Sequence, residues 1–284
     1  MDFFAILIAW AAVQFWGSGG VVQEDVWFEY YQKTIAKLPS SLLRLALLVV
    51  LPALVVFYLL YTLMPLLFSL PVFLLSVAIL LYSLGRGDFQ LQLKLYLNSW
   101  QRGDLVGAYL HARGFSPELC ETGTDNAMQL HLCVRKAVLY QGFERWFAVV
   151  FWFVVLGPAG ALAYRLMFLL AGSGHLPQED RNRAATVLYY AEWLPVRLLG
   201  VAFAIVANFD TSISALRQHW NSQIPSADYL DVIGMKALPQ FLPEGQVDGE
   251  LFIKSAAEEL LAIQNILSRS LVCWIGIVAL LQLF

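Results

Sequence analysis

Long runs of apolar residues, separated by polar stretches, dominate this chain of 284 residues. Residues 42–64 and 146–170 are each long enough to cross a bilayer, which takes about 20 mostly apolar residues in a helix. A further apolar run, residues 66–84, follows Pro65, a residue that breaks helices. The pattern predicts two antiparallel spans joined by a tight turn at Met64 and Pro65. The alternative, one kinked helix, would be about twice as long as the bilayer is thick.

Shorter apolar runs lie at both ends and late in the middle of the chain. Residues 2–16 lack a basic leading region and a small-residue cleavage site, so we expect a retained interfacial or tilted helix rather than a removed signal peptide. Residues 184–208 have a helical pattern that is interrupted at Pro195, and their apolar part, residues 194–207, predicts a helix that is half-embedded or packed inside the bundle. Residues 271–284 predict a terminal apolar helix. The expected fold is an all-α integral membrane protein, a bundle of about four to six apolar helices with a helical cytoplasmic insert.

The polar stretches also predict helices. Residues 89–101 and 104–113 have helical patterns, with Gly114 as a stop signal, and Ser116 with Pro117 can open a third helix. Residues 172–183 are a predicted polar loop, and residues 249–267 a predicted amphipathic helix. We therefore expect N-terminal membrane helices in 1–85, the helical insert in 86–143, central membrane helices in 144–208, a polar segment in 209–268 and a terminal helix in 269–284.

The distribution of basic residues predicts the orientation. Seven Lys and Arg lie between residues 86 and 145, whereas the turn at residues 64–65 has none. Basic loops near spans stay on the cytoplasmic side. The insert and the late polar segment are therefore expected to be cytoplasmic.

Composition supports the membrane prediction and narrows the chemistry. The chain is 59% hydrophobic and 14% charged, against about 45–50% and 25% in soluble domains. A net charge of −3 argues against nucleic acid as a partner. The three Cys and four His have no metal-ligand spacing, and no catalytic motif is present. We predict no catalytic residues and no metal site, and the sequence indicates no cofactor.

A few polar residues are expected at membrane depth, where polar groups are expensive and often functional. Arg165, Glu192, Arg197 and Asn208 are the candidates, together with the neighbouring Tyr164. Glu192 or Glu144 is the expected carboxylate partner of Arg165 or Arg197. A buried arginine needs a carboxylate or several carbonyl groups. Two interpretations stay open: ion pairs that orient the bundle, or a site for a ligand.

Two short blocks carry a resemblance. Residues 157–165 read GPAGALAYR, with Pro158 expected to kink its span, and residues 193–200 read WLPVRLLG. In order and spacing, these blocks resemble the AmpE and CobD/CbiB family of bacterial inner-membrane proteins. The resemblance implies a multi-pass protein of the inner membrane, with a protein partner that would bind through residues 86–143. The oligomeric state is not indicated.

The two branches of this family differ in function. The CobD/CbiB branch comprises corrinoid-modifying, amide-forming enzymes that use ATP and carry acidic segments at two positions. Here those positions read LMFL (166–169) and AATVL (184–188), without an acid, although magnesium and ATP call for carboxylates. The chain therefore resembles the AmpE branch, which implies a non-catalytic regulatory or accessory protein of cell-wall stress signalling and β-lactamase induction. The alternatives are the amide-forming enzyme and, last, a small-molecule carrier.

We predict that Arg197→Leu disturbs assembly or phenotype more than Arg181→Leu, because Arg181 is expected in a polar loop and Arg197 inside a helix at membrane depth. Folding in detergent and a phenotypic assay measure the difference. Equal, negligible effects of the two substitutions would contradict the prediction.

Overall fold

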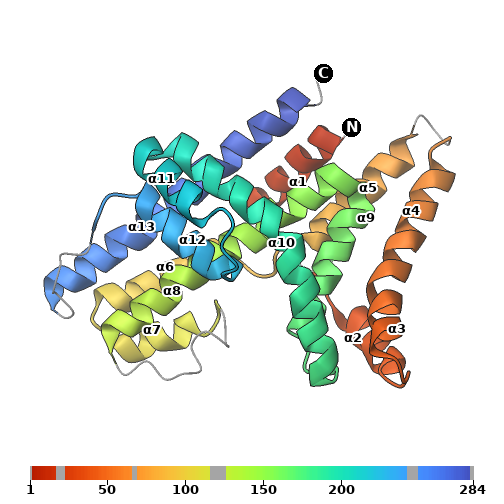
Figure 1. Ribbon diagram of the computed structural model, residues 1–284, viewed down its shortest axis with the longest axis horizontal. Helices are drawn as coiled ribbons and strands as arrows, with labels where there is room; N and C mark the ends of the chain where they lie inside the picture. Colours follow the sequence, from red (N-terminus) through yellow and green to blue (C-terminus); the bar gives the residue numbers. More distant parts are fainter. Residues whose placement is uncertain (1, 17–22, 66–68, 116–125, 242–248, 282–284) are drawn as a thin grey trace. The chain divides into compact units, whose positions relative to one another are not determined.

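A computed structural model describes residues 2–16, 23–65, 69–115, 126–241 and 249–281 (Figure 1). Every regular element in these ranges is a helix, which confirms the predicted all-α class. The contacts divide the chain into two compact units. Unit 1 comprises Met1–Gly87, Arg145–Pro195 and Ile277–Phe284, and unit 2 comprises Asp88–Glu144 and Val196–Gly276. The third helix of the insert, predicted to open at Ser116, lies outside the described residues.

Unit 1 is built around helix α9. Its elements are α1 (Asp2–Trp16), α2 (Val26–Ile35), α3 (Ser41–Leu45), the π-helix η2 (Ala46–Val50), α4 (Leu51–Leu63), α5 (Leu70–Ser83), α9 (Ala148–Ala171) and most of α10 (Gln178–Val206). Helices α1, α4 and α5 all contact α9. Elements η2 and α4 continue α3 without a break, so Ser41–Leu63 is one helical stretch.

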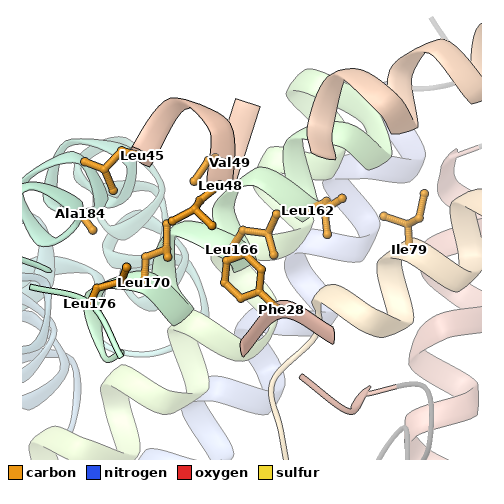
Figure 2. Packing of buried hydrophobic residues seen from close by; sticks show 10 residues of the cluster. All are labelled: Phe28, Leu45, Leu48, Val49, Ile79, Leu162, Leu166, Leu170, Leu176 and Ala184. Atoms are coloured by element: carbon orange, nitrogen blue, oxygen red, sulfur yellow. The ribbon is translucent and has the colours of Figure 1, made fainter. Parts of the chain in front are cut away.

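A cluster of buried apolar side chains joins these elements. The cluster draws on α2, α3, η2, α5, α9, the loop before α10 and the start of α10. Figure 2 shows its members Phe28, Leu45, Leu48, Val49, Ile79, Leu162, Leu166, Leu170, Leu176 and Ala184. The three leucines of α9 at positions 162, 166 and 170 recur every four residues. That spacing places them on one face of the helix.

Helix α4 differs from α9, because none of its residues is buried. Its exposed apolar side chains include Leu54, Phe57, Tyr58 and Tyr61, each 60–69% exposed. A continuous apolar surface of this kind is rare on a soluble monomer and is expected where a helix faces lipid.

Four described helices are long and apolar enough to cross a membrane: Ser41–Leu63, Ala127–Ala171, Gln178–Val206 and Glu250–Leu280. The stretch Ala127–Ala171 has 45 residues and is therefore roughly 68 Å long, more than twice the apolar thickness of a bilayer. Only a part of this stretch can therefore lie within the apolar layer of a bilayer. Helices α1 and α5 are apolar but shorter.

Unit 2 contains α6 (Phe89–Gln101), α7 (Leu105–Ala112), α8 (Ala127–Gly142), α11 (Phe209–His219), α12 (Ser226–Ala237) and most of α13 (Glu250–Leu281). Helix α6 has the bounds predicted for residues 89–101. Side chains of Asp88, Asp104 and Asn126 accept hydrogen bonds from the first free backbone N–H groups of α6, α7 and α8. Such caps fix where a helix begins.

Two helices have bounds that differ from the predicted segments. Helix α10 begins at Gln178, inside the predicted polar loop, and it continues through Pro195. Its start is favoured by Pro177 and by acidic residues in the first turn, which suit a helix N-terminus. The second helix is α13, which crosses the predicted division between residues 268 and 269. Helix α13 runs without interruption through it, because the stretch from Glu250 to Cys273 contains neither Gly nor Pro.

Helix α9 is broken in the middle of its apolar run, as the GPAG block predicts. Gly157 has φ +70° and ψ −164°, a conformation that only glycine adopts readily, and Pro158 follows. Gly160 is needed for a different reason. A Cβ atom there would lie 2.6 Å from the carbonyl oxygen of Trp152 and would overlap Leu156.

Gly160→Ala is expected to destabilise the protein by about 1–3 kcal/mol, because the methyl group meets backbone atoms that cannot move aside cheaply. Thermal unfolding of the purified protein in detergent measures this. Gly276→Ala is the matched control, since a Cβ at position 276 meets no atom within 4 Å. A similar loss in both variants would contradict the explanation by close approach.

Candidate functional site

Two of the six candidate residues form a direct contact inside unit 1. The Tyr164 hydroxyl of α9 donates a hydrogen bond to the Glu192 carboxylate of α10, with 3.0 Å between the oxygen atoms. Both side chains are buried. A hydrogen bond to a charged group is stronger than one between neutral groups, so this contact ties α9 to α10.

Arg165, the next residue of α9, is also buried, and its guanidinium lies 5.1 Å from the centre of the Phe168 ring. Its charge acts on Asp25, which precedes α2. The Asp25 carboxylate accepts hydrogen bonds from Arg86 (2.5 and 3.0 Å) and from the Tyr82 hydroxyl (2.9 Å). Burial raises the pKa of Asp25, but Arg86, Tyr82 and Arg165 together outweigh it and hold the pKa below its ordinary value of 3.8.

Arg197 belongs to unit 2, although it lies on the same helix as Glu192. It is buried and donates hydrogen bonds to the carbonyl oxygens of Trp220 (2.6 Å) and Ser222 (2.9 Å). Its guanidinium also lies 4.9 Å from the centre of the Tyr229 ring. Burial raises the pKa of Tyr229 to about 12, against the opposing charge of Arg197. Arg197 therefore fixes the turn that follows α11.

The remaining candidates have other surroundings. Asn208 is exposed and caps α11 by accepting a hydrogen bond from the Thr211 backbone. Its non-helical backbone ends α10, which explains its place. Glu144 is buried in the π-helix η5 (Phe143–Phe147), between α8 and α9. Arg181 lies in the first turn of α10 and not in a loop.

Sequence reasoning missed a buried ion pair in unit 1. Arg44 of α3 donates two hydrogen bonds to the Asp180 carboxylate of α10, at 2.6 and 2.8 Å, and a further one to the Leu38 carbonyl. Asp180 is fully buried. Arg44 is a lone charge at the edge of an apolar run, which is a signal for a buried arginine. Its partner lies 136 residues away, and no pattern in the sequence connects the two.

A second missed cluster lies in unit 2 and joins three helices. Arg135 of α8 donates two hydrogen bonds to Asp231 of α12, at 2.7 and 2.8 Å, and one to Glu259 of α13, at 3.2 Å. Glu259 also bonds the His131 ring at 2.9 Å. The one indication of this cluster in the sequence is the spacing of His131 and Arg135, which are four residues apart and therefore lie on one face of the helix.

His131 is surrounded by aromatic rings within this cluster. It is fully buried, and its ring centre lies 6.0 Å from that of Trp100 and 6.1 Å from that of Phe252. The Trp100 indole N–H donates to the Ile253 carbonyl, so α6 is attached to α13 at the same place. The charged cluster and the aromatic rings together form the junction of α6, α8, α12 and α13.

These buried groups are arranged to bind one another. Asp25, Asp180, Glu192, Asp231 and Glu259 each accept a hydrogen bond from an Arg, His or Tyr side chain. In the part of the chain that the structure describes, no group of three or more His, Cys, Asp or Glu side chains could hold a metal ion. The geometry suits the positioning of the helices.

Comparisons with known proteins point to one family. The model of the family described as "Regulatory signalling modulator protein AmpE" matches residues 1–238. Protein AmpE of Shigella flexneri is 28% identical over 174 residues, which are 57% of this chain and 59% of that protein. The match therefore spans less than two thirds of this relative's length. No solved structure matches the chain.

Asp231→Asn is expected to destabilise the protein by about 3–5 kcal/mol, because it leaves the largely buried charge of Arg135 without its bidentate partner. Asp228→Asn is the matched control on the same helix. Asp228 pairs with Lys136 at 2.7 Å, and both side chains are exposed, so its loss should cost at most about 1 kcal/mol. Denaturant unfolding in detergent compares the two, and equal losses would contradict the assigned difference in burial.

Proposed function

Because this chain belongs to the AmpE family, we propose that it is a non-catalytic regulatory protein of the bacterial inner membrane, acting in cell-wall stress signalling and β-lactamase induction. The observation that carries the proposal is the family match over residues 1–238. This range includes all six candidate residues and ends directly after α12.

The pairing of buried charges supports a role without catalysis. An enzyme needs acids, bases or metal ligands directed toward a substrate. Here the carboxylates of Asp180 and Asp231 each accept two hydrogen bonds from the guanidinium group of one arginine. Carboxylates that are occupied by an arginine of the same chain are not directed toward a substrate.

The regulatory role requires contact with other molecules, and the insert of residues 86–143 is the proposed region for a protein partner. In the sequence, this insert follows the apolar helix α5 and precedes the apolar helix α9. The basic residues of this region predict a cytoplasmic location, where soluble signalling proteins are accessible. The four long apolar helices support a multi-pass arrangement.

Complementation tests this proposal. In a bacterium whose own AmpE-family gene is deleted, expression of this chain should restore β-lactamase activity after exposure to a β-lactam. Tyr164→Phe removes only the hydroxyl that binds Glu192 and should reduce the restored activity. Tyr190→Phe is the control, since Tyr190 is 70% exposed on α10. Induction that is the same with the chain and with an empty vector would contradict the proposed role.

A biochemical measurement tests the absence of catalysis separately. The purified protein is expected not to consume ATP in the presence of cobyric acid and aminopropanol. Turnover that depends on both substrates would contradict the regulatory proposal and favour the amide-forming enzyme.

A further inference from the structure

Helices α6 and α7 of unit 2 lie side by side (Figure 1). Both helices carry exposed apolar side chains in addition to buried ones. The inner side chains of α6 are buried. The exposed ones, here named the leucine face, are Leu91, Leu95, Leu105, Val106 and Leu110, with exposed fractions from 40% to 74%. On a small helical hairpin, such a face marks an interaction surface.

The charges beside the leucine face are basic. Lys94 of α6 is exposed, and so are Arg102 and Arg113, which directly follow α6 and α7. The two acidic residues of this region, Asp88 and Asp104, accept hydrogen bonds from backbone N–H groups as helix caps, so their charge is partly neutralised. Apolar side chains bordered by Lys and Arg are typical of helices that lie on an anionic membrane surface.

The chain keeps this hairpin close to the bilayer. Residues 84–88 alone connect the apolar helix α5 to α6, and such a link spans at most roughly 20 Å. At the C-terminal end of the insert, α8 continues through η5 into α9 without a loop. Since the predicted side is cytoplasmic, the nearest surface carries anionic lipid headgroups.

We propose that the α6–α7 hairpin binds the cytoplasmic membrane surface, with the leucine face in the headgroup boundary and with Lys94, Arg102 and Arg113 on anionic headgroups. The ligand class is anionic phospholipid. This inference rests on the membrane location within the proposed function and not on the signalling role. A failed induction assay would therefore not contradict the proposed membrane binding, because the depth of the hairpin in the bilayer is measured directly.

The test uses the full chain in nanodiscs that contain phosphatidylglycerol, with a nitroxide label at one position and the native cysteines replaced. Labels at Val106 and Leu110 should collide with oxygen more often than with a water-soluble nickel chelate. A label at Tyr58, on the exposed apolar surface of α4, gives the lipid reference. A label at the exposed Asn182 gives the aqueous reference.

Two results would overturn the proposal. Labels on the leucine face that behave like the Asn182 label would show a surface free in water. Labels that are reached by neither oxygen nor the chelate would show a protein covering, either a second copy or another partner.

The charge requirement is tested by the triple variant K94Q/R102Q/R113Q. In phosphatidylglycerol nanodiscs, the ratio of membrane-bound to free hairpin should fall about fivefold for each basic side chain removed. The matched control is R217Q/K236Q/K254Q, which removes the same charge from exposed positions of unit 2 outside the hairpin. An unchanged ratio in the first variant, or an equal fall in both, would overturn the assignment to these three side chains.

Discussion

A buried charge must be paired, and in each unit one arginine meets this requirement by joining helices that are far apart in the sequence. Arg44 connects α3 to α10 through Asp180, and Arg135 connects α8 to α12 and α13 through Asp231 and Glu259. Removing one partner leaves an uncompensated charge, which is far more costly than never having had the pair. These pairs therefore select one packing of helices over its alternatives.

This selection matters more in lipid than in water. Apolar side chains gain little by leaving lipid for a helix interface, because both surroundings are apolar. Close packing and polar contacts must then define the arrangement. In α9 both are present: Gly160 allows the chain to approach its own preceding turn, and Tyr164 binds Glu192 on α10. The GPAG block thus has a structural reason for each of its glycines.

The helices could be predicted from the sequence more accurately than the tertiary contacts between them. The run at residues 89–101 has a clear period and a capping residue, Asp88, and its bounds agree with α6. Helix α10 was predicted with a break because Pro195 lacks an N–H group, yet the helix continues, as helices at membrane depth often do. In the candidate site, Tyr164 and Glu192 were both predicted as polar groups at membrane depth, but the hydrogen bond between them was not predicted. The partners of Arg44 and Arg135 could not be predicted, because tertiary contacts over about a hundred residues leave no periodic signal.

The division into two units coincides with three weak points of otherwise continuous helices. The chain passes from unit 2 to unit 1 inside the π-helix η5, from unit 1 to unit 2 at Pro195, and from unit 2 to unit 1 after Gly276. A π-turn, a proline and a glycine each lower the resistance of a helix to bending. These three crossings fall where a helix bends most easily, whereas the fourth, between Gly87 and Asp88, lies in the short link between α5 and α6.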